Sequence, residues 1–405
     1  MRCFVVPVFA LLIATTAIVA DPAAAPRKVT FYGDIAPIVY QNCAPCHRPG
    51  ESGPFPLLTY EDVKKHATQI ADVTKRRYMP PWLPEPGYGD FIEERRLSNA
   101  QIQLIQNWVK QGFPAGLSDN APAGPKFTSE WQLGRPDLVL QVPRPYQLGA
   151  DGPEVFWNFI VPMPITATQW IRAIEIRPGN PRVVHHASII LDRSRAARRR
   201  EQEPGAGFAG MDLTVEETTF DPDGAFLAWK PGNIPAPEPE GMAWRADPGM
   251  DLVLNVHLRP AGRAESVNPS IGLYFSDKPQ SRFPLLVELQ RDEAIDIPAG
   301  DRDYIVKDDF RIPLDVTALA IYPHAHYLGK LLEGYATLPN GTRKWLIRIR
   351  EWDLNWQGVY HFKKPVSLPR GTVISMRFHY DNSAANARNP NRRTTEASSP
   401  TSPRS

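Results

Sequence analysis

Residues 252–258 have the sequence LVLNVHL, an apolar run with the length of one β-strand. Turn-forming residues separate it from its neighbours, and the chain contains 43 prolines. Many short strands with frequent turns are typical of antiparallel β-sandwiches. We therefore expect two sandwich domains, at 136–292 and 293–390, with a boundary near 290–302. Four further apolar or alternating runs support this prediction, at 138–142, 183–191, 319–322 and 373–380.

The first part of the chain has a helical pattern. Thr59 can cap a helix over 60–77, in which apolar residues recur at helical spacing. Ser98 and Gln101 form a capping box before a second helix at 99–111. We expect a small helical domain at 28–116. The polar stretch that follows it, 117–135, is rich in Pro, Gly and Ala and predicts a linker.

The two ends of the 405-residue chain indicate export and disorder. Residues 1–20 carry one charge, Arg2, before an apolar stretch, which predicts a signal peptide and a periplasmic or secreted protein. An uncleaved membrane anchor is the alternative. The tail at 391–405 is mostly Arg, Ser, Thr and Pro and is expected to be disordered. A formal net charge of +2 indicates no nucleic-acid partner.

Cys43, Cys46 and His47 form a Cys-x-x-Cys-His motif. This spacing is that of covalent haem c attachment, with the histidine as the proximal iron ligand. A disulfide or half of a zinc site is the alternative, but zinc needs two further ligands nearby. The remaining cysteine, Cys3, lies in the expected signal peptide. No thiol of the mature protein is then left for a structural disulfide.

The loop Tyr78-Met79-Pro80-Pro81-Trp82 offers a sixth iron ligand. The thioether of Met79 would raise the haem potential relative to bis-histidine ligation, and His66 is the rival ligand. The attachment motif, this loop and the helix at 99–111 resemble a class I cytochrome c domain, over about a fifth of the chain. The resemblance implies a small all-α domain that carries haem c.

Five of the nine histidines form two groups in the expected β region. His324 and His326 are two residues apart, so a strand points both to one face, where they can bind one metal. His185 and His186 are adjacent, and a regular strand points them apart. They can share an ion, with His257, through different ring nitrogens or at a distorted strand end. Imidazole-only sets suit copper or zinc, and a polar core role is the alternative for each histidine.

The order and spacing of these histidines, with Leu328-Gly329-Lys330 after the second group, resemble the copper type II, ascorbate-dependent monooxygenases. That family includes peptidylglycine α-hydroxylating monooxygenase, and the resemblance spans roughly 155–385. It implies two jelly-roll sandwiches with one copper each. The first copper would use His185, His186 and His257 and store an electron. The second would use His324, His326 and a methionine, bind dioxygen and attack a substrate C–H bond.

Two features depart from the family pattern. The methionine ligand is expected beyond about residue 395, but no methionine follows Met376. Met376 can replace it only if its strand passes the second copper. The second sandwich is therefore expected to be incomplete, and a shifted reading frame is one hypothesis for the tail. Tyr322 occupies the position where the peptide hydroxylase has an arginine for the substrate carboxylate, so peptidylglycine is not the expected substrate.

These predictions combine into one fold and one activity. The fold class is a small all-α cytochrome c domain followed by two all-β jelly-roll sandwich domains. The activity is that of an exported haem–copper monooxygenase, which takes electrons from a periplasmic donor and acts on a small molecule and O₂. A tethered haem raises the effective concentration of the reductant. The alternatives are a non-enzymatic electron-transfer or copper-binding protein with a defective second site, and a purely structural sandwich.

Overall fold

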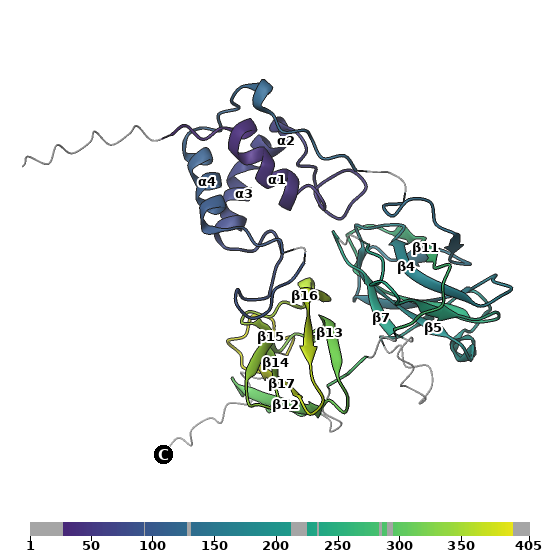
Figure 1. The fold of residues 1–405 in the computed structure, drawn as a ribbon. Helices are drawn as coiled ribbons and strands as arrows, with labels where there is room; N and C mark the ends of the chain where they lie inside the picture. Colours follow the sequence, from purple (N-terminus) through teal and green to yellow (C-terminus); the bar gives the residue numbers. More distant parts are fainter. Residues whose placement is uncertain are drawn as a thin grey trace, which may run out of the picture.

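The computed structural model describes residues 27–92, 94–127, 131–211, 225–232, 235–282, 286–289 and 295–391 (Figure 1). About 15% of the described residues lie in helices and 31% in strands. The expected signal peptide, the tail beyond residue 391 and part of the expected domain boundary, 290–294, lie outside these ranges. Among the described helices, none combines the length and the apolar character that crossing a bilayer requires.

Short helices form the first part of the chain, at the top of Figure 1. Capping boxes open α2 and α4, and the expected helix at 60–77 is divided into α2 and α3 at His66. Phe31, Ile105 and Trp108 lie fully buried in the core that these helices share. The helices are α1 (Ala36–Asn42), α2 (Tyr60–Lys65), α3 (Ala67–Lys75) and α4 (Asn99–Lys110), with short irregular turns at Phe31–Ile35 and Ser118–Asn120.

The first β region contains a five-stranded sheet of order β6-β3-β9-β5-β7 and a four-stranded sheet of order β1-β11-β4-β8. A small pair, β10-β2, lies beside them. The strands are β1 (Leu138–Gln141), β2 (Tyr146–Leu148), β3 (Val155–Pro162), β4 (Gln169–Arg177), β5 (Val184–Asp192), β6 (Phe208–Ala209), β7 (Ala225–Trp229), β8 (Trp244–Ala246), β9 (Asp251–Leu258), β10 (Glu265–Val267) and β11 (Ser270–Phe275), with a short helix at Ala196–Arg200.

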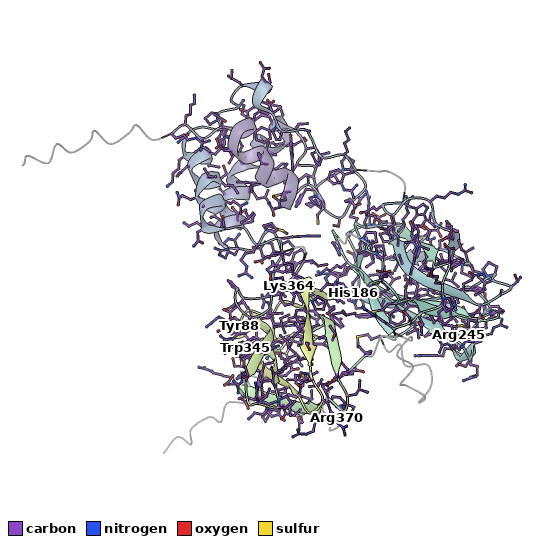
Figure 2. The ribbon with its side chains drawn as sticks, viewed as in Figure 1. Tyr88, His186, Arg245, Trp345, Lys364 and Arg370 are labelled. Carbon is purple, nitrogen blue, oxygen red and sulfur yellow. The ribbon has the colours of Figure 1, made fainter. Side chains whose placement is uncertain are left out.

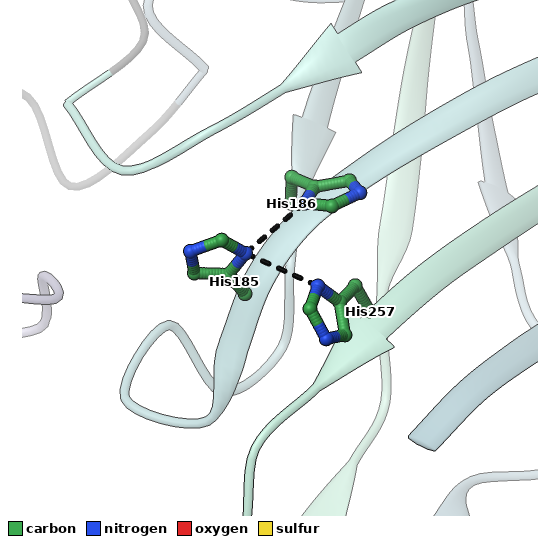
Figure 3. A group of neighbouring side chains, drawn as sticks. All are labelled: His185, His186 and His257. Carbon is green, nitrogen blue, oxygen red and sulfur yellow. Dashed lines mark hydrogen bonds between the residues drawn. The ribbon is translucent and has the colours of Figure 1, made fainter. Parts of the chain in front are cut away.

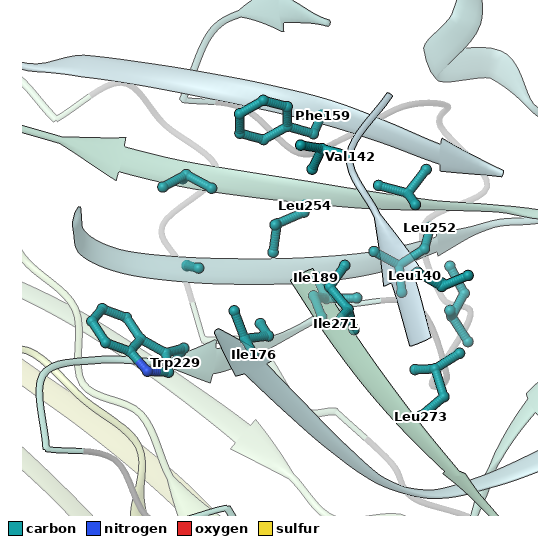
Figure 4. Close-up of a cluster of buried hydrophobic side chains, with 14 of the residues drawn as sticks. Leu140, Val142, Phe159, Ile176, Ile189, Trp229, Leu252, Leu254, Ile271 and Leu273 are labelled. Atoms are coloured by element: carbon teal, nitrogen blue, oxygen red, sulfur yellow. The ribbon is translucent and has the colours of Figure 1, made fainter. Parts of the chain in front are cut away.

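One apolar core joins the two large sheets of this region (Figure 4). Leu252 and Leu254 of β9 and Ile189 of β5 enter it from the five-stranded sheet, while Ile271 of β11 enters it from the other. Every residue of β9 is buried. A central strand that is covered on both faces is held rigidly, so β9 is a firm support for any side chain that it carries.

The second β region contains a four-stranded sheet of order β12-β17-β14-β15 and the pair β13-β16. Its core includes Leu332, Ile349, Trp352 and Phe378. The strands are β12 (Tyr304–Arg311), β13 (Val316–Ile321), β14 (Gly329–Thr337), β15 (Arg343–Ile349), β16 (Tyr360–Leu368) and β17 (Val373–Tyr380), with a short helix at Leu354–Trp356. All the strand pairings in both regions are antiparallel.

The expected fold class, an all-α cytochrome c domain followed by two jelly-roll sandwiches, is wrong. The chain is mostly β-sheet with a small helical portion. Residues 82–92, expected within the helical domain, pack on the second β region instead. Phe91 is 4% exposed and forms a β-bridge with Phe362 in the core of that region. Tyr88 contacts Trp345 at 4.9 Å between ring centroids (Figure 2).

The composition of residues 82–92 explains why they pack on the second β region and not among the helices. It contains prolines at 84 and 86 and follows two more at 80 and 81. Proline lacks the N–H that an interior helix position needs, so the segment cannot continue α3. Its backbone hydrogen-bonds to the sheet, with Glu85 N–H donating to Arg348 O at 2.8 Å and Ile92 N–H donating to His361 O at 3.0 Å. The aromatic side chains of Trp82 and Phe91 therefore pack in the core of the second β region.

Candidate metal centre

His185, His186 and His257, named here the three-histidine group, lie on the neighbouring strands β5 and β9. His186 pairs directly with His257, while the register shifts between Val184 and His186. His185 is therefore the extra residue of a β-bulge. A bulge redirects the side chains beside it, so the two adjacent histidines need not point to opposite faces. The sequence analysis gave a distorted strand end as one way for His185 and His186 to share an ion, and the structure has this distortion.

The three imidazoles converge on one point (Figure 3). Nδ1 of His185 lies 3.1 Å from Nδ1 of His186 and 3.1 Å from Nδ1 of His257. Three nitrogens that each bind one ion at about 2.0–2.1 Å in tetrahedral geometry lie roughly 3.3 Å apart. The group can therefore hold a metal ion with little rearrangement. It is the one set of three or more His, Cys, Asp or Glu residues with such geometry in the described part of the chain.

Hydrogen bonds to ring nitrogens assign the tautomers of the three histidines. His257 donates from Nε2–H to Glu154 Oε2 at 2.8 Å, and His185 donates from Nε2–H to Asn355 O at 2.9 Å. Gln357 donates from Nε2–H to Nδ1 of His186 at 3.3 Å. Each neutral imidazole carries one proton, so all three Nδ1 atoms present lone pairs. Lone pairs held this close repel one another, and a cation at their centre removes the repulsion.

Burial keeps the three rings neutral. Desolvation, and then the neighbouring His257 and His185, lower the pKa of His186 to about 2. Desolvation, and then His185, lower the pKa of His257 to about 4, and desolvation lowers that of His185. The flat stack of Phe156 on His257, at 4.1 Å, contributes to this burial. Since neutral imidazole is the metal-binding form, the group is ready for a metal at neutral pH.

His324 and His326, the histidine pair, follow β13 rather than lying in it, because that strand ends at Ile321. Their placement in a strand was therefore wrong, although the two rings do approach, with centroids 5.0 Å apart. Ala325 between them is buried in the second β core. His324 donates from Nδ1–H to Gln357 Oε1 at 2.7 Å, and desolvation lowers its pKa.

The third ligand expected for the histidine pair is a methionine, and the structure describes one of the two positions considered for it. Met376 lies in β17 and packs against the second β core. Within the described ranges, no further histidine, cysteine or carboxylate completes a three-ligand set with His324 and His326. The position expected to carry the methionine, beyond about residue 395, lies outside the described residues. The described pair thus offers two imidazoles.

A cavity of about 250 Å³ borders both histidine groups. His185 and His257 line it from the first β region, and His326 and Trp352 line it from the second. Figure 2 shows His186 at the side of the first β region that faces the second. Both groups therefore border one space between the two β regions. The other lining residues are Glu154, Arg259, Tyr327, Asp353, Leu354, Asn355 and Arg388.

The Cys-x-x-Cys-His motif forms a turn directly after α1. His47 N–H donates to Cys43 O at 2.9 Å, and neither Cys43 nor Cys46 is in a disulfide. Burial raises the pKa of Cys43 to about 12 and also raises that of Cys46. His47 donates from Nδ1–H to Phe55 O at 3.1 Å, which leaves Nε2 as its metal-binding nitrogen. Free thiols and an oriented imidazole fit covalent haem attachment.

The two candidates for the sixth iron ligand lie in different surroundings. Met79 is half-buried, and its N–H donates to Val73 O at 3.3 Å. Its neighbour Tyr78 contacts the ring of Trp356 edge-on at 6.3 Å. His66 stacks flat on Phe55 at 3.7 Å. Neither arrangement decides between the two ligands, so Met79 stays a prediction.

The thiol motif lies near the three-histidine group. Nη1 of Arg95 is 4.0 Å from Sγ of Cys46, and the same guanidinium donates to Gly232 O. Arg95 also lines a small cavity with His185 and His186. One side chain therefore connects the surroundings of Cys46 with those of two of the three histidines.

Sequence reasoning missed the residues that orient these histidines. Glu154, Arg95, Asn355 and Gln357 come from segments distant in the chain, and no motif singles them out. The one available signal is the polar sequence 353–357, DLNWQ, which interrupts the strand pattern before β16. No protein-family model matches the chain, and a search of curated proteins found no match.

Proposed function

We propose that this chain is an exported haem c and copper oxidoreductase that hydroxylates a C–H bond of a small molecule. The balanced reaction is R–H + O₂ + 2 e⁻ + 2 H⁺ → R–OH + H₂O, with single electrons from a periplasmic donor. The main observation in support is the convergence of three Nδ1 lone pairs at His185, His186 and His257. The signal-like residues 1–20 support export.

Copper suits the donor sets. An imidazole-only set is typical of copper or zinc, and only copper of the two changes oxidation state. Copper would supply one-electron storage at the three-histidine group and dioxygen chemistry at the histidine pair. Glu154 and Asn355 hold two of the rings from outside, so the first set keeps its geometry in both oxidation states. The cavity between the groups offers space for a small substrate.

Haem c would be held by Cys43, Cys46 and His47, and would supply an electron entry point. The free thiols and the single open nitrogen of His47 support this assignment. Arg95 lies against Cys46 and lines a cavity with His185 and His186, which keeps the path toward the three-histidine group short. A donor tethered in this way needs no diffusional encounter for each electron.

The alternative is an electron-transfer or copper-binding protein without oxygen chemistry. The observation that favours it is the histidine pair, which offers two imidazoles and no further histidine, cysteine or carboxylate ligand in the described ranges. A two-ligand copper site binds weakly and leaves its oxygen chemistry uncontrolled. The alternative therefore predicts one tightly held copper, at the three-histidine group.

Metal and haem quantification separates the two. The full chain, matured in a copper-replete periplasm, should carry one covalent haem and two coppers, and should consume O₂ when reduced. The variants His185→Ala and His324→Ala should each remove about one copper. His379→Ala is the matched control, because His379 pairs with Asp303 at 2.8 Å and lines neither of the two cavities beside the histidine groups.

The outcomes point to different conclusions. Two coppers with reductant-dependent O₂ uptake support the monooxygenase. One copper, lost in His185→Ala and kept in His324→Ala, with no O₂ uptake supports the electron-transfer protein. Copper content that neither variant changes contradicts both proposals. An absent pyridine haemochrome spectrum contradicts the haem assignment alone.

A further inference from the structure

Gln357 touches both histidine groups. It lies between β15 and β16, directly after the short helix Leu354–Trp356, and its side chain is 4% exposed. Its Oε1 accepts from His324 Nδ1–H at 2.7 Å and from the Tyr322 hydroxyl at 3.1 Å. Its Nε2–H donates to His186 Nδ1 at 3.3 Å. Two donors on Oε1 and one acceptor on Nε2 assign the orientation of the amide.

A metal on the three-histidine group competes with one of these contacts. Nδ1 of His186 carries a single lone pair, and this lone pair faces Nδ1 of His185 at 3.1 Å. The lone pair can bind an ion or accept the Gln357 N–H, but it cannot do both. Metal binding there therefore breaks the bond from Gln357 to His186. The same side chain is then free to change how it holds His324.

We propose that Gln357 is a positioning residue that couples metal binding at the two histidine groups, an inference that rests on the proposed function. It leaves Nε2 of His324 as the nitrogen that would bind a metal, since Nδ1–H is bound to the amide oxygen. It also holds a hydrogen bond that must break before His186 binds a metal. Coupling of this kind is reciprocal, so occupation of one group changes the affinity of the other.

Replacing Gln357 with leucine should move the two affinities in opposite directions. At the three-histidine group, Cu(II) should bind about 2- to 10-fold more tightly, because one competing hydrogen bond is gone. At the histidine pair, binding should weaken about 10- to 100-fold, the usual loss when an outer partner of a ligand histidine is removed. A general loss of structure would weaken both.

The experiment measures each group alone in the full chain. His326→Ala leaves the three-histidine group, and His257→Ala leaves the pair. In each background, Cu(II) affinity is measured by competition with a chromophoric chelator, with and without Gln357→Leu. Copper hyperfine splitting in electron paramagnetic resonance reports the ligand set, and thermal unfolding reports folding.

A second variant and a control keep the test independent of folding. Gln357→Glu keeps an oxygen acceptor for His324 Nδ1–H, so it should restore the affinity of the pair to near the parent value. Gln106→Leu is the control: it removes a hydrogen bond of 2.7 Å to Ala71 O in the helical part and should change neither affinity.

Opposite shifts with rescue by glutamate show that Gln357 acts on both groups in opposite senses, as the coupling requires. Shifts in the same direction, or a pair affinity that glutamate does not restore, overturn it while the proposed function stands. Parent protein that binds no copper at the three-histidine group overturns both, and this is visible before any variant of Gln357 is made.

Discussion

Replacing Glu154 with alanine should weaken copper binding at the three-histidine group about tenfold. Oε2 of Glu154 accepts the Nε2–H of His257 at 2.8 Å, and Oε1 pairs with Arg259 at 2.9 Å. The carboxylate thus holds the tautomer of His257 whose Nδ1 faces the other two rings. Outer partners of ligand histidines typically contribute about 10- to 100-fold to metal affinity, which is about 1.4–2.7 kcal/mol.

The exposure of the Glu154–Arg259 ion pair places the expected loss of copper affinity at the lower end of this range. The side chain of Glu154 is 30% exposed and that of Arg259 is 49% exposed, so water replaces part of what alanine removes. Glu154→Gln keeps a neutral acceptor for His257 Nε2–H, and its loss should be smaller than that of alanine because hydrogen bonds to charged groups are stronger.

The assay is chelator competition with Cu(II) in the His326→Ala background. Glu203→Ala serves as the control, since Glu203 forms an exposed ion pair with Arg144 at 3.0 Å. Unchanged affinity in Glu154→Ala would refute the argument that this carboxylate orients His257. A larger loss in Glu154→Gln than in Glu154→Ala would refute it as well.

Three further predictions concern retention of copper and stability. Acidification from pH 7 to about pH 5 should leave copper on the three-histidine group, because burial lowers the pKa of His257 to about 4 and that of His186 to about 2, and protons compete for each ring only below its folded pKa. Dialysis and metal analysis measure this. Phe91→Ala should lower the free energy of unfolding by about 3–5 kcal/mol, measured by urea denaturation, because it empties a core position that is 4% exposed. Asn255→Leu should cost about 1–3 kcal/mol by the same measurement, because it strands the buried Oδ1 of Asn158, which now accepts Asn255 Nδ2–H at 2.8 Å.

Each of these has a result that contradicts it. Copper that dissociates with a midpoint near the ordinary histidine pKa of about 6.5 would show solvated rings rather than buried ones. A cost below about 1 kcal/mol for Phe91→Ala would show that residues 82–92 do not dock on the sheet. The double variant Asn158→Leu with Asn255→Leu should cost less than the sum of the single variants, and full additivity would contradict a direct contact.

Local sequence signals predicted local structure well. The apolar runs at 138–142, 183–191, 252–258, 319–322 and 373–380 all contribute strands, because alternation and β-branched residues act over a few positions. The capping box of Ser98 and Gln101 opens α4 as predicted. The division of the helix expected at 60–77 was not predictable from apolar spacing, since the break at His66 leaves that spacing intact.

Long-range contacts account for what the sequence did not reveal. The fold class failed because the position of residues 82–92 depends on a sheet that begins more than two hundred residues later. Nothing in the local pattern around Phe91 distinguishes burial among helices from burial against strands. The prolines around it exclude a helix, but they do not indicate which part of the chain the segment packs against.

The candidate site shows the same division between residue type and geometry. The sequence identified His185, His186 and His257 by composition and spacing, but alternation alone would have separated the first two. A single extra residue in β5 opposite β9 reverses that conclusion. Its position follows from the pairing of two strands that lie about seventy residues apart in the chain. The bulge leaves His185 without a partner in the β5–β9 register, and it gathers three imidazoles into a group that could hold a metal ion.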